Sequence, residues 1–236
     1  MSYRVELLIK QQTYQQLVNI SQHLNKGEKK DVAKELGQAF TDMSCQVLDQ
    51  LFGTLIEEQR ANSQLSAEGK KSLKEAEQIF NQIESAMKKY MPWSISLFSN
   101  ERLKPVANHI LKKFDASENA EVVMHYQLDK HLGENSFNDL QKLQQGDVQN
   151  LRGTLKNLIQ VIDLGVSEFI RDPKTLLKFN FVVDKTLNGV ISMVTSTGYK
   201  RLEKVADDYE KSSSNDEKLQ HYGHHFSKFV LEIKMN

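Results

Sequence analysis

The chain has 236 residues, of which 39% are hydrophobic and 26% are charged, a composition that excludes global disorder. Its 31 basic and 31 acidic side chains cancel, so the basic excess that is typical of nucleic-acid binders and peripheral membrane proteins is missing. The lone Cys45 cannot form an internal disulfide, Glu6 and Lys10 interrupt any signal sequence, and no apolar run reaches the roughly 20 residues that span a bilayer. These properties predict a cytoplasmic protein without a transmembrane segment.

Residues 3–9 are the ambiguous part of the chain. Apolar side chains alternate at Val5, Leu7 and Ile9, which is a weak strand pattern. Helical spacing then continues to Leu24, and no partner strand is apparent, although a lone strand needs one. We therefore expect a helix from the start, with a short strand as the alternative.

Apolar residues at steps of three and four predict helices along the rest of the chain. The three prolines are Pro92, Pro105 and Pro173, and we expect helices to end or begin near them because proline lacks the amide donor. Gly133 is expected to end another helix. The predicted helices cover residues 31–60, 67–90, 105–114, 118–132, 136–145, 147–171, 173–211 and 216–233.

These elements predict an all-α bundle of seven to eight mostly long, antiparallel helices, possibly with a short N-terminal strand. Apolar steps of three and four over residues 67–90 resemble a coiled-coil seam. We expect one helical domain over residues 1–236. The alternative is two helical subdomains, residues 1–133 and 134–236.

His221 and His225 are the most suggestive pair of metal ligands. They are four residues apart in the last predicted helix, a spacing at which two imidazoles can meet one metal ion. A helical metal site needs further ligands from another helix, commonly Glu-x-x-His pairs, and the chain contains none. We expect solvated polar side chains there and no cofactor, with a metal-binding bundle as the alternative.

One stretch resembles the active-site helix of the chemotaxis response-regulator phosphatases. It reads Gln-Gly-Asp-Val-Gln-Asn-Leu-Arg-Gly-Thr-Leu-Lys-Asn-Leu-Ile-Gln-Val-Ile over residues 145–162. In that family an Asp and a Gln one turn apart orient the water that attacks an aspartyl phosphate. Those positions fall on Asn150 and Thr154, and threonine has no amide to present. The resemblance implies a regulator of a phosphorylated signalling partner, acting through the helix over residues 147–162.

The N-terminal order of elements is similar in outline to a ribbon-helix-helix DNA-binding module. A possible strand is followed by a helix near residues 13–24, a charged turn and a second helix from Asp31. The module would imply a dimer whose paired strands enter the major groove. Here the second helix is expected to run for about eight turns, longer than the module uses, and nucleic acid is not the expected partner.

A cluster of apolar residues, Trp93, Ile95, Leu97 and Phe98, lies in a non-periodic segment after Pro92. We expect this cluster to be buried under the bundle, and the alternative is an exposed patch that docks a partner. No catalytic motif is recognisable, so a non-enzyme is favoured. The resulting hypothesis is a helical interaction or adaptor protein whose partner is another protein or a second copy of the chain.

Overall fold

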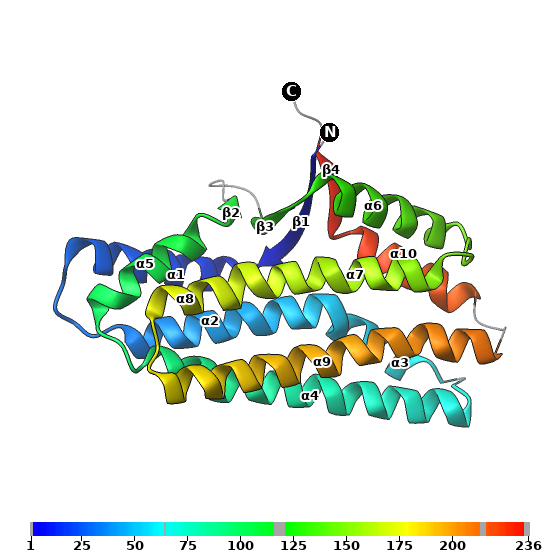
Figure 1. Ribbon diagram of the computed structural model, residues 1–236, viewed down its shortest axis with the longest axis horizontal. Coiled ribbons are helices and arrows are strands. Elements are labelled where there is room, and N and C mark those ends of the chain that lie inside the picture. Colours follow the sequence, from blue (N-terminus) through cyan, green and yellow to red (C-terminus); the bar gives the residue numbers. More distant parts are fainter. Residues whose placement is uncertain (1, 64, 116–120, 213–215, 234–236) are drawn as a thin grey trace. The chain divides into compact units, whose positions relative to one another are not determined.

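A computed structural model describes residues 2–63, 65–115, 121–212 and 216–233 of the chain (Figure 1). Most of these residues are helical, as the apolar spacing predicts. The α-helices are α1 (Gln11–Lys26), α2 (Ala33–Leu48), α3 (Thr54–Ala61), α4 (Ala67–Ile95), α5 (Asn100–Leu111), α6 (Lys130–Gln144), α7 (Leu151–Val166), α8 (Asp172–Leu177), α9 (Phe181–Ser212) and α10 (Asp216–Ser227). The π-helical segments are η1 (Asp49–Gly53) and η2 (Ser167–Arg171). The strands are β1 (Ser2–Ile9), β2 (Phe114–Asp115), β3 (Val122–Leu128) and β4 (Val230–Ile233).

The four strands form one antiparallel sheet with the order β2-β3-β1-β4. The prediction of a mostly helical chain is confirmed, but the sheet is larger than the single short strand that the sequence suggested. In β1 the apolar side chains Tyr3, Val5, Leu7 and Ile9 alternate with more exposed neighbours and are buried. The expected helix over residues 3–9 is wrong, because β1 has a partner strand on each side.

The partner strand β4 comes from the far end of the chain. Ser2 lies opposite Ile233 and Val5 opposite Val230 in antiparallel register. Just beyond the paired strands, the backbone N–H of Glu6 donates to the carbonyl of Phe229 at 2.9 Å. The predicted helix over residues 216–233 therefore ends at Ser227, and the chain continues as a strand.

Strand β3 replaces most of another predicted helix. Val122, Met124, Tyr126 and Leu128 are buried and alternate with less buried residues, the period-two pattern of a strand. The predicted helix over residues 118–132 is wrong here, and its residues 118–120 lie outside the described chain. Gly133 was expected to end that helix, and it lies instead in the first turn of α6.

Helix α4 continues through Pro92 to Ile95, five residues beyond its predicted end at Tyr90, so the prediction that this proline ends the helix is wrong. Proline removes one backbone donor, but only in the last turn of the helix. The Ser94 hydroxyl donates to the carbonyl of Met91 at 3.0 Å. Gly37 of α2 makes room for the proline, since a Cβ at Gly37 would lie 2.8 Å from the Pro92 Cα.

Several long predicted helices are interrupted. The helix predicted over residues 31–60 contains η1, and the one over residues 147–171 begins at Leu151 and changes into η2. The helix predicted from Pro173 breaks between α8 and α9, where Lys178 has a φ of 50°. The break predicted between residues 211 and 216 begins with Ser212, which is still in α9, and its residues 213–215 lie outside the described chain. Helix α5 begins at Asn100, five residues before its proline.

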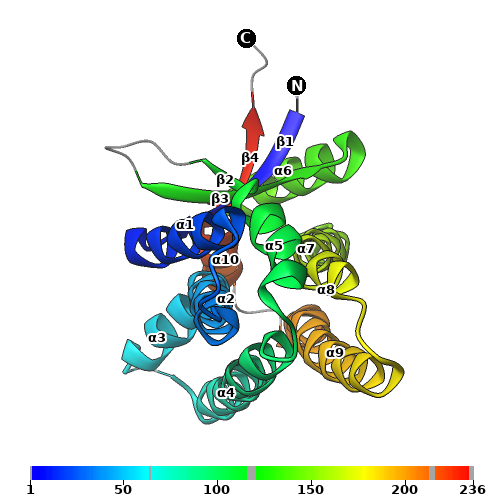
Figure 2. The ribbon, with the colours of Figure 1, turned by 90° about the vertical axis from the view of Figure 1, so that its left-hand side faces the viewer.

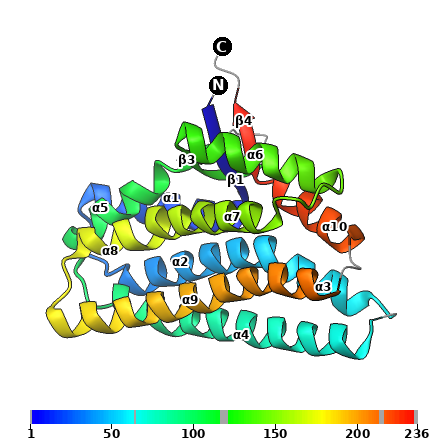
Figure 3. The same cartoon turned by 45° about the vertical axis from the view of Figure 1, so that its right-hand side comes forward.

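The chain groups into two compact units, and the domain predictions stay predictions. Unit 1 comprises Met1–Leu7, Met124–Arg171 and Thr195–Asn236, and unit 2 comprises Leu8–Val123 and Asp172–Val194. In unit 1, α6 packs against α7, α10 and β4, and Figure 3 shows α10 running beside α6. The core cluster of unit 1 consists of Leu143, Leu151, Leu155, Ala206 and Leu219.

Unit 2 is built around α2 and α5. Helix α2 packs against α1, α4 and η1, and α5 packs against α1 and α8 (Figure 2). The side chains of Leu36, Met43, Leu103, Val106 and Ile110 are almost fully buried. This core supports two turns of the chain, one between α4 and α5 and one between α8 and α9.

Candidate functional site

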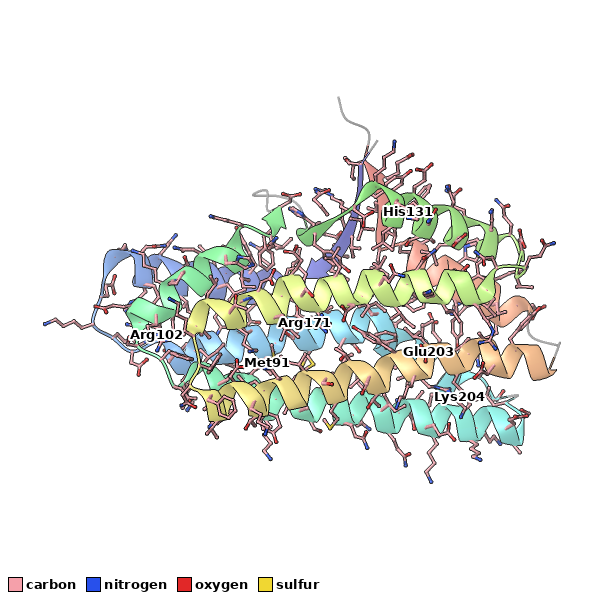
Figure 4. The ribbon with its side chains drawn as sticks, viewed as in Figure 1. Met91, Arg102, His131, Arg171, Glu203 and Lys204 are labelled. Carbon is pink, nitrogen blue, oxygen red and sulfur yellow. The ribbon has the colours of Figure 1, made fainter. Side chains whose placement is uncertain are left out.

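Arg102, which Figure 4 labels, lies in the first turn of α5 in unit 2 and links the α4–α5 turn to the α8–α9 turn. Its guanidinium donates to the carbonyl oxygens of Leu177 and Lys178. The same guanidinium lies 4.5 Å from the centre of the Phe98 ring, and that ring packs edge-on against Phe179 with centroids 4.7 Å apart. Two turns that are far apart in the sequence are therefore held together by hydrogen bonds, a cation–π contact and an aromatic pair.

Five large apolar side chains near this fastening are exposed, and we refer to them together as the apolar end. Their exposed fractions are 39% for Trp93, 48% for Leu97, 40% for Leu176, 80% for Phe181 and 71% for Val182. Isolated exposed apolar residues are ordinary on protein surfaces. Here five of the seven exposed large apolar side chains among the described residues lie within five residues in sequence of the Phe98–Phe179 contact, and Phe181 and Val182 are consecutive.

The predicted apolar cluster after Pro92 is divided between the core and the surface. Ile95 and Phe98 are buried, and Trp93 and Leu97 are exposed. Trp93 and Leu97 are four residues apart across the end of α4 and the turn that follows it. The sequence cluster therefore supplies two members of the apolar end and two residues that anchor it.

The other three members, Leu176, Phe181 and Val182, were not singled out from the sequence. The apolar stripe of the predicted helix runs through Val183, Leu187 and the residues that follow at helical spacing. Phe181 and Val182 precede this stripe and do not belong to its face. Two consecutive large apolar residues outside the stripe are the signal that could have identified them.

Local contacts fix the start of α9, where Phe181 and Val182 lie. The Asn180 side chain accepts a hydrogen bond from the backbone N–H of Val183 at 3.0 Å, as an N-cap does. Lys174 of α8 pairs with Asp184 of α9. The hydrogen bond from Lys174 lowers the pKa of the Asp184 carboxyl. The two apolar side chains are thus presented by a capped helix that is tied to its neighbour.

A second polar cluster lies in unit 1, around the carboxylate of Asp163 at the end of α7. Arg171 of η2 donates to both carboxylate oxygens, at 3.0 and 2.8 Å, and the Tyr199 hydroxyl of α9 donates at 2.7 Å. The hydrogen bonds from Arg171 lower the pKa of Asp163, although burial opposes this, and burial raises the pKa of Tyr199. Figure 4 labels Arg171.

Short π-helical segments often occur at functional sites, and η2 supplies Arg171 to this cluster. Asp163 is ionised and already accepts three hydrogen bonds, and Arg171 uses its donors on Asp163 and on the Ser167 hydroxyl at 2.9 Å. A general base needs a pKa near the working pH, and here it is lowered instead. The arrangement acts as a clamp that ties α9 to α7.

Asn150 and Thr154, the positions aligned with the phosphatase site, lie at the start of α7. The hydroxyl of Thr154 donates to the carbonyl of Asn150 at 3.0 Å, and Thr154 is buried. The side chain of Asn150 folds over Gly153, where an added Cβ would meet its Oδ1 at 2.3 Å. The hydroxyl that would have to orient water is therefore engaged in its own helix, and the phosphatase hypothesis stays a prediction.

The structure gives His221 and His225 of α10 different surroundings. His221 is exposed, whereas His225 is buried and packs against the rings of Phe226 and Phe229, with centroids 5.1 and 5.4 Å away. Within the residues that the structure describes, no three His, Cys, Asp or Glu side chains gather as a metal site would require. The metal-binding hypothesis stays a prediction.

Comparison of the chain with protein-family models, with curated protein sequences and with solved structures finds no match. Among the described residues, no helix has the length and apolar character that are needed to cross a membrane. A proposal for the function therefore depends on the residues of the chain itself.

Proposed function

We propose that this chain is a non-enzymatic interaction protein that docks on another protein through the apolar end. The observation that carries the proposal is the exposure of Phe181 and Val182, four-fifths and seven-tenths exposed, together with the exposure of Trp93, Leu97 and Leu176, all of which lie close in sequence to the contact between Phe98 and Phe179. Aromatic side chains are enriched among the residues that dominate binding energy at protein interfaces. Grouped exposed apolar side chains are a recognised mark of an interaction surface.

The rigidity of the surface also favours a binding role. The hydrogen bond from Arg102, the N-cap at Asn180 and the pair between Lys174 and Asp184 fix the backbone that carries Leu176, Phe181 and Val182. A surface that is already ordered loses less conformational entropy on binding, so more of the contact energy becomes affinity. A flexible apolar tail would lack this advantage.

The proposal is tested by site-specific photo-crosslinking in the cells that make the protein. A photoreactive phenylalanine analogue replaces Phe181 in one version and Leu8 in a control version, because Leu8 is an exposed apolar residue of β1 outside the apolar end. We expect a crosslinked protein that depends on position 181. That protein is then purified, and its affinity for the wild-type chain and for Phe181→Ser is measured by calorimetry.

Removal of an aromatic anchor should weaken binding at least about tenfold, and Leu8→Thr should leave the affinity unchanged. Circular dichroism confirms that both variants are folded. Equal binding by Phe181→Ser would contradict the proposal. Crosslinks at position 181 to a second copy of this chain alone would also contradict it, since they would show self-association.

A further inference from the structure

The two sequence segments that contain the apolar end are rich in basic residues, although the formal net charge of the chain is zero. The two segments that carry it, residues 89–104 and 172–188, contain six basic and three acidic side chains. The basic residues are Lys89, Arg102, Lys104, Lys174, Lys178 and Lys185, and the acidic residues are Glu101, Asp172 and Asp184. The surplus of three positive charges around this surface is balanced by the rest of the chain.

Some of these basic side chains are engaged by groups of the chain itself, and others are exposed and can contact a partner. Arg102 is engaged by two carbonyl oxygens, and Lys174 is paired with Asp184. Lys104, Lys178 and Lys185 are exposed, and none of them pairs with a carboxylate in the part of the chain that the structure describes. The first turn of the 32-residue helix α9 adds the partial positive charge of a helix N-terminus beside Phe181.

We infer that the partner presents an acidic segment that also carries aromatic or aliphatic side chains. This inference rests on the proposed function and specifies the chemistry of its partner. The apolar side chains of such a segment cover Phe181, Val182 and Leu176, and its carboxylates reach Lys178 and Lys185, which flank Phe181 and Val182 in the sequence. Complementary charge speeds association and fixes orientation, and apolar contact supplies the affinity.

An anionic membrane is the competing source of negative charge, and the charge count favours the protein segment. Recognition of anionic lipids typically uses clusters of four to eight basic residues. The apolar end has a surplus of three positive charges, and the rest of the chain carries the balancing negative charge, which an extended anionic surface would repel. A short acidic segment interacts only with the local charges.

The test uses the full chain and three fluorescein-labelled synthetic peptides of equal length. All three carry leucine and phenylalanine at the same positions, and their other positions are glutamate, serine or lysine. Fluorescence anisotropy gives the affinity of each peptide. The variants are Phe181→Ser and the charge reversal Lys178→Glu with Lys185→Glu. The matched control is Lys70→Glu with Lys71→Glu, two exposed lysines near the start of α4.

We expect the glutamate peptide to bind at least tenfold more tightly than the serine peptide. Phe181→Ser and the reversal at Lys178 and Lys185 should each weaken it at least tenfold, and the reversal at Lys70 and Lys71 should change it less than twofold. Equal or tighter binding of the serine or lysine peptide through Phe181 would overturn the acidic partner and leave the docking surface standing.

Absence of binding by all three peptides would also overturn the inference. Vesicles of phosphatidylserine and phosphatidylcholine in equal parts form a separate arm, measured by co-sedimentation. Vesicle binding that is lost in Phe181→Ser, without binding of the glutamate peptide, would assign the surface to lipid instead. The crosslinking at position 181 is scored independently, so failure of the proposed function is distinguishable from failure of the acidic partner.

Discussion

The protonation of Asp163 is expected to make the stability of unit 1 depend on pH. Its carboxylate accepts hydrogen bonds from Arg171 and Tyr199, and the bonds from Arg171 are the largest cause of its lowered pKa. A carboxyl whose pKa is lower in the folded chain than in the unfolded chain stabilises the fold above the unfolded value of about 3.9. That contribution is lost as the pH falls through the lowered pKa.

Asp163→Asn should therefore destabilise the protein at neutral pH and much less in acid. We expect a loss of about 1 kcal/mol in the free energy of unfolding at pH 7, because the partly exposed charge is screened by solvent. Urea unfolding at pH 7, 5 and 3 measures the difference between variant and wild type, which should shrink between pH 5 and pH 3. The control Asp172→Asn alters an exposed side chain and should cost less than about 0.5 kcal/mol at pH 7. A difference that stays constant with pH would contradict the assignment.

Cys45 is expected to be a poorly reactive thiol. Burial raises its pKa to about 11, and the nearby charge of Glu84 acts in the same direction. Only the thiolate reacts with alkylating reagents, so at pH 8 the folded chain should react on the order of a hundredfold more slowly than the chain unfolded in urea. Iodoacetamide labelling followed by mass spectrometry measures both rates.

Glu84→Gln provides the directional check on Cys45, because it removes the negative charge and frees Lys88, which lies 2.8 Å from Glu84. The labelling rate of the folded variant should rise. An unchanged rate would mean that burial alone sets the reactivity of the thiol.

At the scale of elements, close approach between α2 and α4 depends on Gly37. A Cβ there would lie 2.8 Å from the Pro92 Cα and 3.3 Å from its carbonyl oxygen, and backbone atoms cannot move aside cheaply. Alanine normally favours a helix over glycine by up to about 1 kcal/mol, but overpacking costs about 1–3 kcal/mol. Gly37→Ala should therefore lower the thermal midpoint, as scanning calorimetry can measure.

Gly189 of α9 is the matched control for Gly37, because nothing lies within 4 Å of an added Cβ. Gly189→Ala should raise the midpoint, since only the helix propensity changes. Replacement of glycine by alanine is thus expected to lower the thermal midpoint in α2 and to raise it in α9. Destabilisation by both variants, or by neither, would contradict the packing explanation.

The helices were predictable from local spacing, and the strands were not. At the end of the chain, Phe226, Phe229 and Ile233 read as one more helical face, and only the pairing of Val230 with Val5 reveals the strand β4. That pairing joins residues more than two hundred positions apart, which no local pattern records. In β3 the period-two pattern was present, but it is only seven residues long and lies within a longer predicted helix.

The apolar end was predictable in part for a related reason. Trp93 and Leu97 are conspicuous because they interrupt a helical pattern, whereas Phe181 and Val182 lie within the helix predicted over residues 173–211, just before its apolar stripe. The contact that unites the two turns, Arg102 with the carbonyl of Lys178, depends on backbone groups. Backbone carbonyls are present at every residue, so the sequence carries no mark of which one an arginine will bind.

At the scale of the whole molecule, the boundaries between the two units fall inside single strands and helices. Strands β1 and β3 and helix α9 each contain residues of both units. Unfolding of one unit therefore removes hydrogen-bonded partners from elements that continue into the other. We expect one unfolding transition in differential scanning calorimetry, with equal calorimetric and van't Hoff enthalpies. Two resolved transitions would contradict this coupling.

The pairing of β1 with β4 can form only when synthesis of the chain is nearly finished. Val5 leaves the ribosome 225 residues before its partner Val230. At elongation rates of about 5–20 residues per second, this edge of β1 stays unpaired for roughly 10–45 s. An unpaired strand edge is a template for pairing with other chains. The nascent protein must therefore protect its first strand, through the helices that form early or through a chaperone, until its last strand has been made.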